Sequence, residues 1–238
     1  MKSRLAVFTW SLLAAGGAFA SATNDLSDAE IQGRQLAQQL CEARPTENLT
    51  NTGALQIRNG NGMRTEISVK FQTIATAANW LTIYETTSEA YRIKLIVVHG
   101  DKQPSRYQFR EGDLTGNEIM TPFAGSDFWI ADLGLEFFHW PEQKILKHEM
   151  RRGCSCKVLE STNPNPSING YLRVVSWIDN ESGGIVYAEA YDAKDRLLKE
   201  FDPKSFKKVN GQWELQDTEI RNVQTGSRTR LEFDLKSK

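Results

Sequence analysis

Hydrophobic positions along the chain repeat with two spacings, and each spacing predicts a different kind of element. Residues 66–71, 91–97 and 231–235 alternate between apolar and polar, which is typical of half-buried strands. The Asn210-Gly211 pair between 206–209 and 212–215 predicts a hairpin turn. Further strand-like runs occupy 81–86, 105–110, 145–150, 171–178, 185–191, 197–201 and 212–221. The sequence therefore predicts around ten short strands.

Two segments carry helical signals instead. Ser27 and Glu30 form a capping-box pattern, and the apolar stripe that follows predicts a helix over 28–43, ended by Pro45. A second helix is predicted over 125–138, with Ser126 as its N-cap. Apolar residues occupy most of the circumference of this second helix, so we expect it to be buried or to lie in a cavity.

This order of elements predicts a mostly antiparallel β fold with a few α-helices. Two helices cannot cover both faces of a parallel sheet, so a doubly wound fold is disfavoured. A strongly curved sheet or incomplete β-barrel, with the helices on its concave face, accounts for all the elements. The chain shows no repeat and no linker, so we expect a single domain over 23–238.

The first 22 residues have the pattern of a secretory signal peptide. Lys2 and Arg4 precede an apolar stretch, and small residues occupy the cleavage positions around Ala20 and Ala22. The alternative, a transmembrane anchor, requires about 20 strongly apolar residues, and this stretch is too short and too rich in glycine and alanine. We therefore predict an exported, soluble protein in the periplasm.

Charge excludes some partners. The chain carries 29 Lys and Arg against 30 Asp and Glu, and its net charge of −1 becomes −3 when the leader is removed with its two basic residues. Such a balance offers no broad basic surface, so neither nucleic acid nor general binding to anionic membranes is expected.

The cysteines and histidines leave alternatives open. A structural disulfide from Cys41 to Cys154 or Cys156 is one expectation in an exported chain, and unpaired thiols are the other. Catalytic redox chemistry at Cys154-Ser155-Cys156 is disfavoured, because no metal or redox spacing accompanies it. The three histidines match no zinc spacing. We therefore predict no metal site and no cofactor.

Enzyme motifs are missing as well. The chain has no nucleophile elbow, no phosphate-binding loop and no dinucleotide fingerprint. Asp127 and Asp132 lie about 140° apart on the predicted helix, so they do not converge as an acid/base pair and are interpreted as a cap and a solvent or loop contact. We predict that the protein is not an enzyme and has no catalytic residues.

Several blocks of sequence resemble the outer-membrane lipoprotein-sorting protein family, which is related to LolA and LolB. The resemblance covers roughly residues 50–236, although the chain lacks the proline near 185–186 and the glycine near 195 that the family pattern contains. The matching blocks are Gly125-Ser126-Asp127-Phe128 with Asp132-Leu133, Trp177-Ile178-Asp179, Ala188-Glu189-Ala190-Tyr191-Asp192, Leu197-Leu198-Lys199, Trp213 and Thr229-Arg230-Leu231.

This resemblance implies a LolA-like half-barrel that carries acyl chains of a lipoprotein or lipid to the outer membrane. An inner-membrane transporter and an outer-membrane acceptor would be its partners. The predicted cavity wall comprises Ile67, Val69, Phe71, Ile93, Leu95, Val97, Phe233 and Leu235, and the predicted lid contains Phe128, Trp129, Leu133 and Phe137.

Two other interpretations remain. Alternating strands and an aromatic-rich helix are also what a solid core requires, without any cavity. The protein could alternatively be a non-catalytic envelope adapter that docks on a transporter or secretion complex. An adapter predicts an exposed apolar patch, whereas a carrier predicts an enclosed apolar space.

Overall fold

The computed structural model describes residues 26–45, 47–87, 92–100, 103–109, 112–209 and 212–235. The predicted leader at 1–22 and the predicted turn at Asn210-Gly211 lie outside the described residues. In the described part of the chain, no helix is long and apolar enough to cross a membrane.

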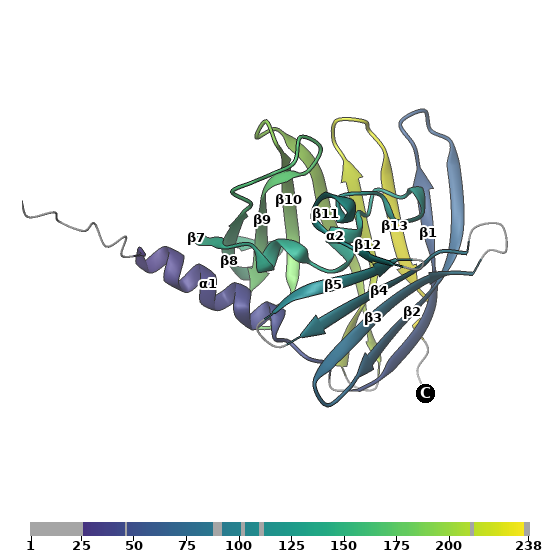
Figure 1. Cartoon of the computed structure of the whole chain (residues 1–238), viewed down its shortest axis with the longest axis horizontal. Coiled ribbons are helices and arrows are strands. Elements are labelled where there is room, and N and C mark those ends of the chain that lie inside the picture. The colour runs from purple at the N-terminus through teal and green to yellow at the C-terminus, as the bar shows by residue number, and fades with distance from the viewer. Residues whose placement is uncertain are drawn as a thin grey trace, which may run out of the picture.

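The described strands form one 13-stranded antiparallel sheet with the order β6-β5-β4-β3-β2-β1-β13-β12-β11-β10-β9-β8-β7 (Figure 1). The first strand therefore lies beside the last, with Leu55 opposite Leu231. The strands are β1 (Leu49–Arg58), β2 (Arg64–Ala75), β3 (Asn79–Thr86), β4 (Lys94–Gly100), β5 (Gln103–Phe109), β6 (Gly112–Leu114), β7 (Glu142–Arg151), β8 (Cys154–Thr162), β9 (Tyr171–Asp179), β10 (Ile185–Asp192), β11 (Leu197–Val209), β12 (Gln212–Asn222) and β13 (Arg228–Phe233).

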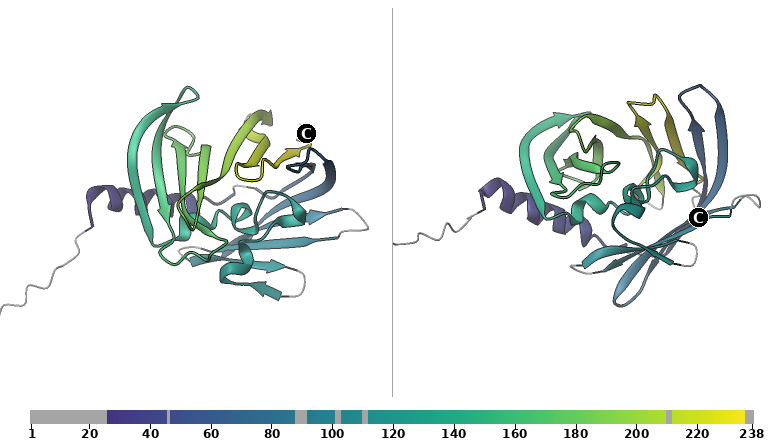
Figure 2. Two further views of the ribbon diagram at one scale, coloured as in Figure 1. Left: turned by 90° about the horizontal axis from the view of Figure 1, so that it is seen from above. Right: turned by 45° about the horizontal axis from the view of Figure 1, so that its top comes forward.

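The sheet curls strongly but does not close, because β6 and β7 are not paired with each other (Figure 2). This architecture confirms the predicted incomplete barrel. Two predicted elements differ from the structure in their extent. Residues 197–201 and 206–209 are parts of one strand, β11, whose pairing with β12 shifts register on both sides of Ser205. Most of β1 and β8 was not predicted at all.

Strand β1 escapes prediction because polar residues and Gly53 interrupt its alternation. Gly53 is required by close packing. A Cβ atom at this position would collide with the backbone carbonyl of Glu232 in the neighbouring β13. Glycine inside a strand is a typical sign of such a close backbone approach.

Helix α1 (Asp28–Cys41) begins as predicted. Glu30 accepts a hydrogen bond of 2.8 Å from the backbone N–H of Ser27, which completes the capping box. The helix then packs against β7 so closely that a Cβ atom on Gly33 would lie 2.5 Å from the backbone nitrogen of Lys144. Its buried side, at Ala37, joins an apolar cluster with Phe138 and Ile145.

The predicted helix over 125–138 is wrong as a continuous element. The structure contains three short pieces instead: η3 (Phe123–Gly125), α2 (Ile130–Leu133) and η4 (Glu136–His139), preceded by η2 (Gly116–Ile119). Ser126 does not begin a helix. Its hydroxyl donates to the carbonyl of Phe123 (2.6 Å) and accepts from the N–H of Phe128 (3.2 Å), which holds a tight turn. Leu135, with φ of 50°, separates α2 from η4.

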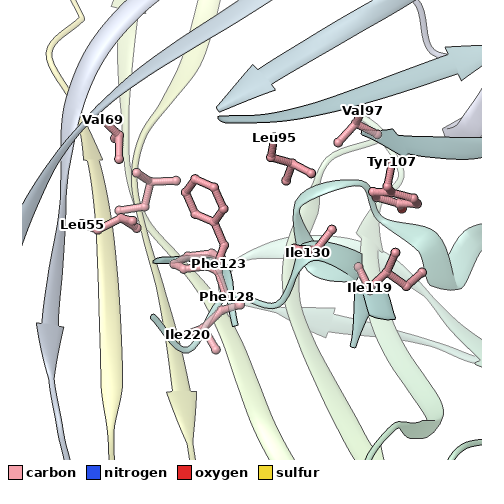
Figure 3. Packing of buried hydrophobic residues seen from close by; sticks show 12 residues of the cluster. Leu55, Val69, Leu95, Val97, Tyr107, Ile119, Phe123, Phe128, Ile130 and Ile220 are labelled. Atoms are coloured by element: carbon pink, nitrogen blue, oxygen red, sulfur yellow. The ribbon is translucent and has the colours of Figure 1, made fainter. Parts of the chain in front are cut away.

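We call residues 115–139 the crossing segment, because Figure 2 shows them running inside the curve of the sheet. Their apolar side chains face several directions because strands surround them. In Figure 3, Phe123, Phe128 and Ile130 of this segment point towards Leu55 and Val69 on one side and Leu95 on the other. Close packing of this kind, rather than a helical period, determines the residue pattern here.

Candidate functional site

The crossing segment is fastened to β13 through Asp127. The backbone N–H of Asp127 donates to Thr229 Oγ1 (2.9 Å), and the Thr229 hydroxyl donates to Asp127 Oδ2 (2.9 Å). Ser227 donates to the other carboxylate oxygen at 2.5 Å. Thr229 is fully buried, so these bonds are shielded from water and fix the position of this part of the segment.

A second attachment is built around the buried Lys199 of β11. Its ammonium donates to the backbone carbonyl of Asp127 (2.7 Å) and to Asp132 Oδ2 (3.2 Å). The hydroxyl of Tyr171 donates to the same carboxylate at 2.9 Å. Trp129 stacks on Tyr171, and the Lys199 ammonium lies 3.7 Å from the centre of the Trp129 ring. We call Lys199, Asp132, Tyr171 and Trp129 the Lys199 cluster.

The electrostatics of this cluster follow from its burial. Only 3% of the Lys199 side chain and 12% of the Asp132 side chain are exposed. Burial lowers the pKa of the Lys199 ammonium to about 8, although the nearby Asp132 carboxylate opposes this shift. Burial and the same carboxylate raise the pKa of Tyr171. Asp132 also accepts a bond from the N–H of Trp129 (2.8 Å), so it caps α2 as well as pairing with Lys199.

The carboxylates of the two aspartates have different partners, and neither contacts only solvent or a loop. Sequence reasoning missed their convergence on Lys199. A signal was present, because Asp127, Asp132 and Lys199 all belong to the blocks that carried the family resemblance. These separate blocks meet in space at one buried polar cluster.

The other end of the crossing segment is attached to β4 and β5. Ser105 Oγ lies 3.2 Å from Nδ1 of His99 and 3.2 Å from Nε2 of His139. Burial lowers the pKa of His99 to about 4 and also lowers the pKa of His139, so both rings are neutral at pH 7. Two of the three histidines, which the sequence separates widely, therefore serve together in one buried hydrogen-bonded group.

Glu136 of the crossing segment is held by a hydrogen bond to β5. Its carboxylate accepts a hydrogen bond of 3.0 Å from the hydroxyl of Tyr107. Burial raises the pKa of Glu136 from its ordinary value of 4.5 to about 7, although the bond from Tyr107 opposes this shift. Tyr84 adds a further bond from its hydroxyl to the carbonyl of Leu133, at 3.2 Å.

The raised pKa of Glu136 predicts a specific pH dependence. Between pH 4.5 and 7 the native state binds more protons at this group than the unfolded state, so its contribution to stability falls as pH rises. Glu136→Gln removes this titration. The unfolding free energy of the variant minus that of the wild type should rise by up to about 3 kcal/mol across the window. Urea unfolding at a series of pH values measures this difference.

Glu142→Gln is the matched control, because Glu142 is exposed on β7. His99 titrates in the opposite direction over part of the same range, but it does so in the wild type and in both variants and therefore cancels in the difference. A difference for Glu136→Gln that stays constant with pH would contradict the assignment.

Between the crossing segment and the sheet lies an open apolar cleft with a volume of about 630 Å³. Strands from both halves of the sheet, α1 and the crossing segment contribute to it. Its apolar lining comprises Leu40, Ala43, Leu49, Phe71, Tyr84, Phe128, Leu133, Leu135, Phe138, Ile185, Phe201, Pro203, Phe206, Leu215, Leu231, Phe233 and Leu235. Asp132 also reaches it, so the Lys199 cluster lies at its inner boundary.

Some of the residues predicted as wall and lid line the cleft, and the others do not. The following five line the cleft: Phe71, Phe128, Leu133, Phe233 and Leu235. Val69, Leu95 and Val97 are instead packed in the core, with exposures of 4%, 0% and 0%. Ile67 and Ile93 pack against that core, Trp129 stacks in the Lys199 cluster, and Phe137 lines a smaller neighbouring pocket.

Sequence reasoning missed other cleft residues, of which Phe206 is the most informative. In the first part of β11 the buried positions are Lys199 and Pro203, both odd-numbered. The pairing with β12 is irregular on both sides of Ser205, and the even-numbered Phe206 beyond it lines the cleft opposite Leu215 while 51% of it stays exposed. A bulge re-aims side chains in this way without leaving a pattern that a simple period could detect.

Of the two alternatives for the cysteines, the structure has unpaired thiols: Cys41, Cys154 and Cys156 are all free. Cys41 packs in the cluster beside α1, whereas Cys154 and Cys156 belong to a separate cluster on β8, β9 and β10. Burial raises the pKa of the Cys41 thiol to about 12, which makes it unreactive at neutral pH. Among the described residues, no group of three or more His, Cys, Asp or Glu is arranged to hold a metal ion.

Many of the residues of this site lie in a part of the chain that matches a known protein family. A family model described as an uncharacterized protein, "-like", matches residues 110–236, which is more than half of the chain. The chain belongs to this family. The match includes the whole Lys199 cluster and the whole crossing segment. No curated protein matches the chain in sequence.

Solved structures with the same fold support the LolA-like architecture. A protein of the DUF1329 family from Desulfovibrio piger is 19% identical, with a TM-score of 0.70, over 87% of this chain and 92% of that one. A domain from Vibrio parahaemolyticus, described as an outer membrane lipoprotein-sorting protein, is 20% identical, with a TM-score of 0.72 and the same coverage. A LolA superfamily protein from Nitrosomonas europaea is 14% identical, with a TM-score of 0.61, over 89% and 94%. The resemblance seen in the sequence is thus confirmed at the level of the fold.

Proposed function

We propose that the protein is a periplasmic carrier or chaperone that holds acyl chains of a lipoprotein or lipid in the apolar cleft, for transfer to the outer membrane. The observation that carries this proposal is the cleft itself, an open space of about 630 Å³ whose lining is mostly apolar. Its volume lies within the range of small-molecule sites, about 300–1,000 Å³.

The energetics favour such a role. Exposing a sixteen-carbon acyl chain to water costs about 12 kcal/mol, at about 0.8 kcal/mol for each methylene group. Contact with Phe71, Phe206 and Phe233 would offset much of this cost. The cleft is bounded by the crossing segment, which side-chain hydrogen bonds hold at Asp127 and Asp132 on one side and at Glu136 on the other.

The residues proposed to contact the acyl chain are a revised set. We retain the predicted residues that line the cleft, and add Phe206 and Leu215 from the β11–β12 hairpin. Val69, Leu95 and Val97 become structural residues, because they pack in the core and do not line the cleft. Of the four residues of the predicted lid, Phe128 and Leu133 stay in the proposed set.

The fold likeness to lipoprotein-sorting proteins supports a periplasmic location and a non-catalytic role. An inner-membrane transporter and an outer-membrane acceptor are the partners we propose. The adapter alternative requires an exposed apolar patch, and the cleft is open to solvent rather than enclosed as the carrier interpretation predicted. The large exposed apolar residues lie on several different elements, among them Met63 on the β1–β2 turn, Met150 on β7 and Ile168 before β9, and this distribution favours the carrier.

Binding of a fluorescent fatty-acid probe to the purified protein tests the proposal. We expect saturable binding, weakened about tenfold or more by Phe206→Glu, because a carboxylate beside the chain removes apolar contact and requires desolvation. Met150→Glu is the control: Met150 is 66% exposed on β7 and does not line the cleft. Absence of saturable binding, or equal loss in both variants, would refute the carrier function.

A further inference from the structure

Four arginines form a row across neighbouring strands at one end of the sheet. Arg58 of β1 lies opposite Arg64 of β2 and opposite Arg228 of β13, and Arg228 lies opposite Arg221 of β12. All four side chains are exposed. We call them the arginine row. They occupy the ends of strands next to the β1–β2 and β12–β13 turns, which lie side by side in Figure 1.

This arrangement is unfavourable for the protein alone. Like charges directly opposite each other on adjacent strands destabilise a sheet. Neighbouring strands lie about 4.8 Å apart, so the backbone positions of the four arginines span about 15 Å. Among the described residues, only Arg221 of the four has an acidic partner, Glu200, at 3.8 Å. By contrast, Arg230 in the next row is paired with Asp217.

An open groove of about 650 Å³ runs along the row. Arg58, Arg64 and Arg228 line it together with Arg230, and two carboxylates, Glu66 and Glu219, line it as well, so the groove keeps an excess of positive charge. No aromatic side chain lines the groove, and Ile57 is its only large apolar lining residue. A protein partner would need apolar or aromatic anchors there, because these supply most of the energy of protein interfaces.

We propose that the arginine row binds the phosphate groups of an anionic lipid bilayer. Guanidinium groups pair well with phosphates, and regularly spaced cations suit a surface of many headgroups better than one enclosed ligand. Met63, 65% exposed on the adjacent turn, can enter the headgroup layer. The net charge of the chain opposes such binding only weakly, because salt screens charges beyond about 8–10 Å.

The row and the cleft lie towards opposite ends of β1, but they come closer on β13, where Leu231 lines the cleft three residues, or about 10 Å, from Arg228. On β1 the cleft is lined by Leu49 and Asn51, whereas Arg58 ends the strand about 23 Å from Asn51. Membrane binding through the row uses residues that do not line the cleft. It does not depend on any acyl ligand, so this proposal and the carrier function can fail independently.

Sedimentation with lipid vesicles tests the proposal. The purified protein should bind vesicles of phosphatidylcholine that contain phosphatidylglycerol, and not vesicles of phosphatidylcholine alone. Added salt should weaken binding. Arg58→Gln combined with Arg228→Gln should weaken it about 30-fold, or about fivefold for each arginine. Lys94→Gln combined with Arg106→Gln removes the same charge from exposed positions on β4 and β5, and should bind like the wild type.

Three results would overturn the proposal. These are equal binding to both kinds of vesicle, no binding to either, and an equal loss of binding in the two double variants. Tighter binding of soluble polyglutamate than of anionic vesicles would also overturn it, by identifying an acidic polypeptide as the partner. The melting temperature of the arginine variant should not fall, because like-charge repulsion is relieved, so loss of binding cannot be assigned to unfolding.

Discussion

Lys199→Met is expected to lower the free energy of unfolding by about 3–5 kcal/mol. Methionine preserves most of the volume of lysine, so packing against the Trp129 ring is largely kept. The loss is electrostatic instead. The Asp132 carboxylate, with 12% of its side chain exposed, would remain buried without its cation, and the carbonyl of Asp127 would lose its donor. Urea unfolding followed by tryptophan fluorescence measures the change.

A second substitution distinguishes this reason from lost packing. Lys199→Met combined with Asp132→Asn removes both charges, and should recover most of the lost stability, since an uncharged pair carries no desolvation penalty. Lys204→Met is the control on the same strand. Its side chain is 39% exposed and pairs with Asp202, so its loss should cost less than about 1 kcal/mol. A small effect of Lys199→Met alone would contradict the importance of the cluster.

Leu95→Ala should reduce stability by about 2–5 kcal/mol, because Leu95 is fully buried and its truncation leaves a cavity. The affinity of the folded variant for a fatty-acid probe should stay unchanged, since Leu95 does not line the cleft. Phe206→Ala should show the opposite result. It is 51% exposed, so stability should change by about 0.5 kcal/mol or less while probe affinity falls.

Thermal unfolding and probe titration on the same two variants provide this comparison. If Leu95→Ala lost affinity without losing stability, Leu95 would be a wall residue, as the sequence suggested. If Phe206→Ala kept full affinity, the β11–β12 hairpin would not contact the ligand. The two measurements therefore separate residues that stabilise the fold from residues that contact the fatty-acid probe.

Local signals in the sequence predicted much of the fold. The capping box at Ser27 and the alternation in 66–71 depend on neighbouring residues only, and both are found in the structure. The crossing segment was wrongly predicted to be one helix, because its apolar residues pack against strands on several sides rather than along one helical face. Alternation also cannot separate Leu95, which packs in the core, from Phe71, which lines the cleft, because that distinction depends on where the crossing segment lies.

The candidate site was predictable only in part for related reasons. Lysine is ordinarily exposed, so Lys199 gave no sign of burial except through its place in a family pattern. Phe206 follows an irregularity in strand pairing that no period reveals. The arginine row was hidden by a near-neutral total charge, because Arg58, Arg64 and Arg228 come together only when β2, β1 and β13 pair.

The open sheet has one further consequence, which concerns self-association. Every incomplete barrel has two border strands, whose unpaired backbone groups can recruit a second molecule. Here β6 contains three residues, too few to template an intermolecular ladder, and β7 carries Lys144 and Lys147 beside the tightly packed α1. The N-terminal helix thus protects the longer border strand against aggregation while the sheet stays open.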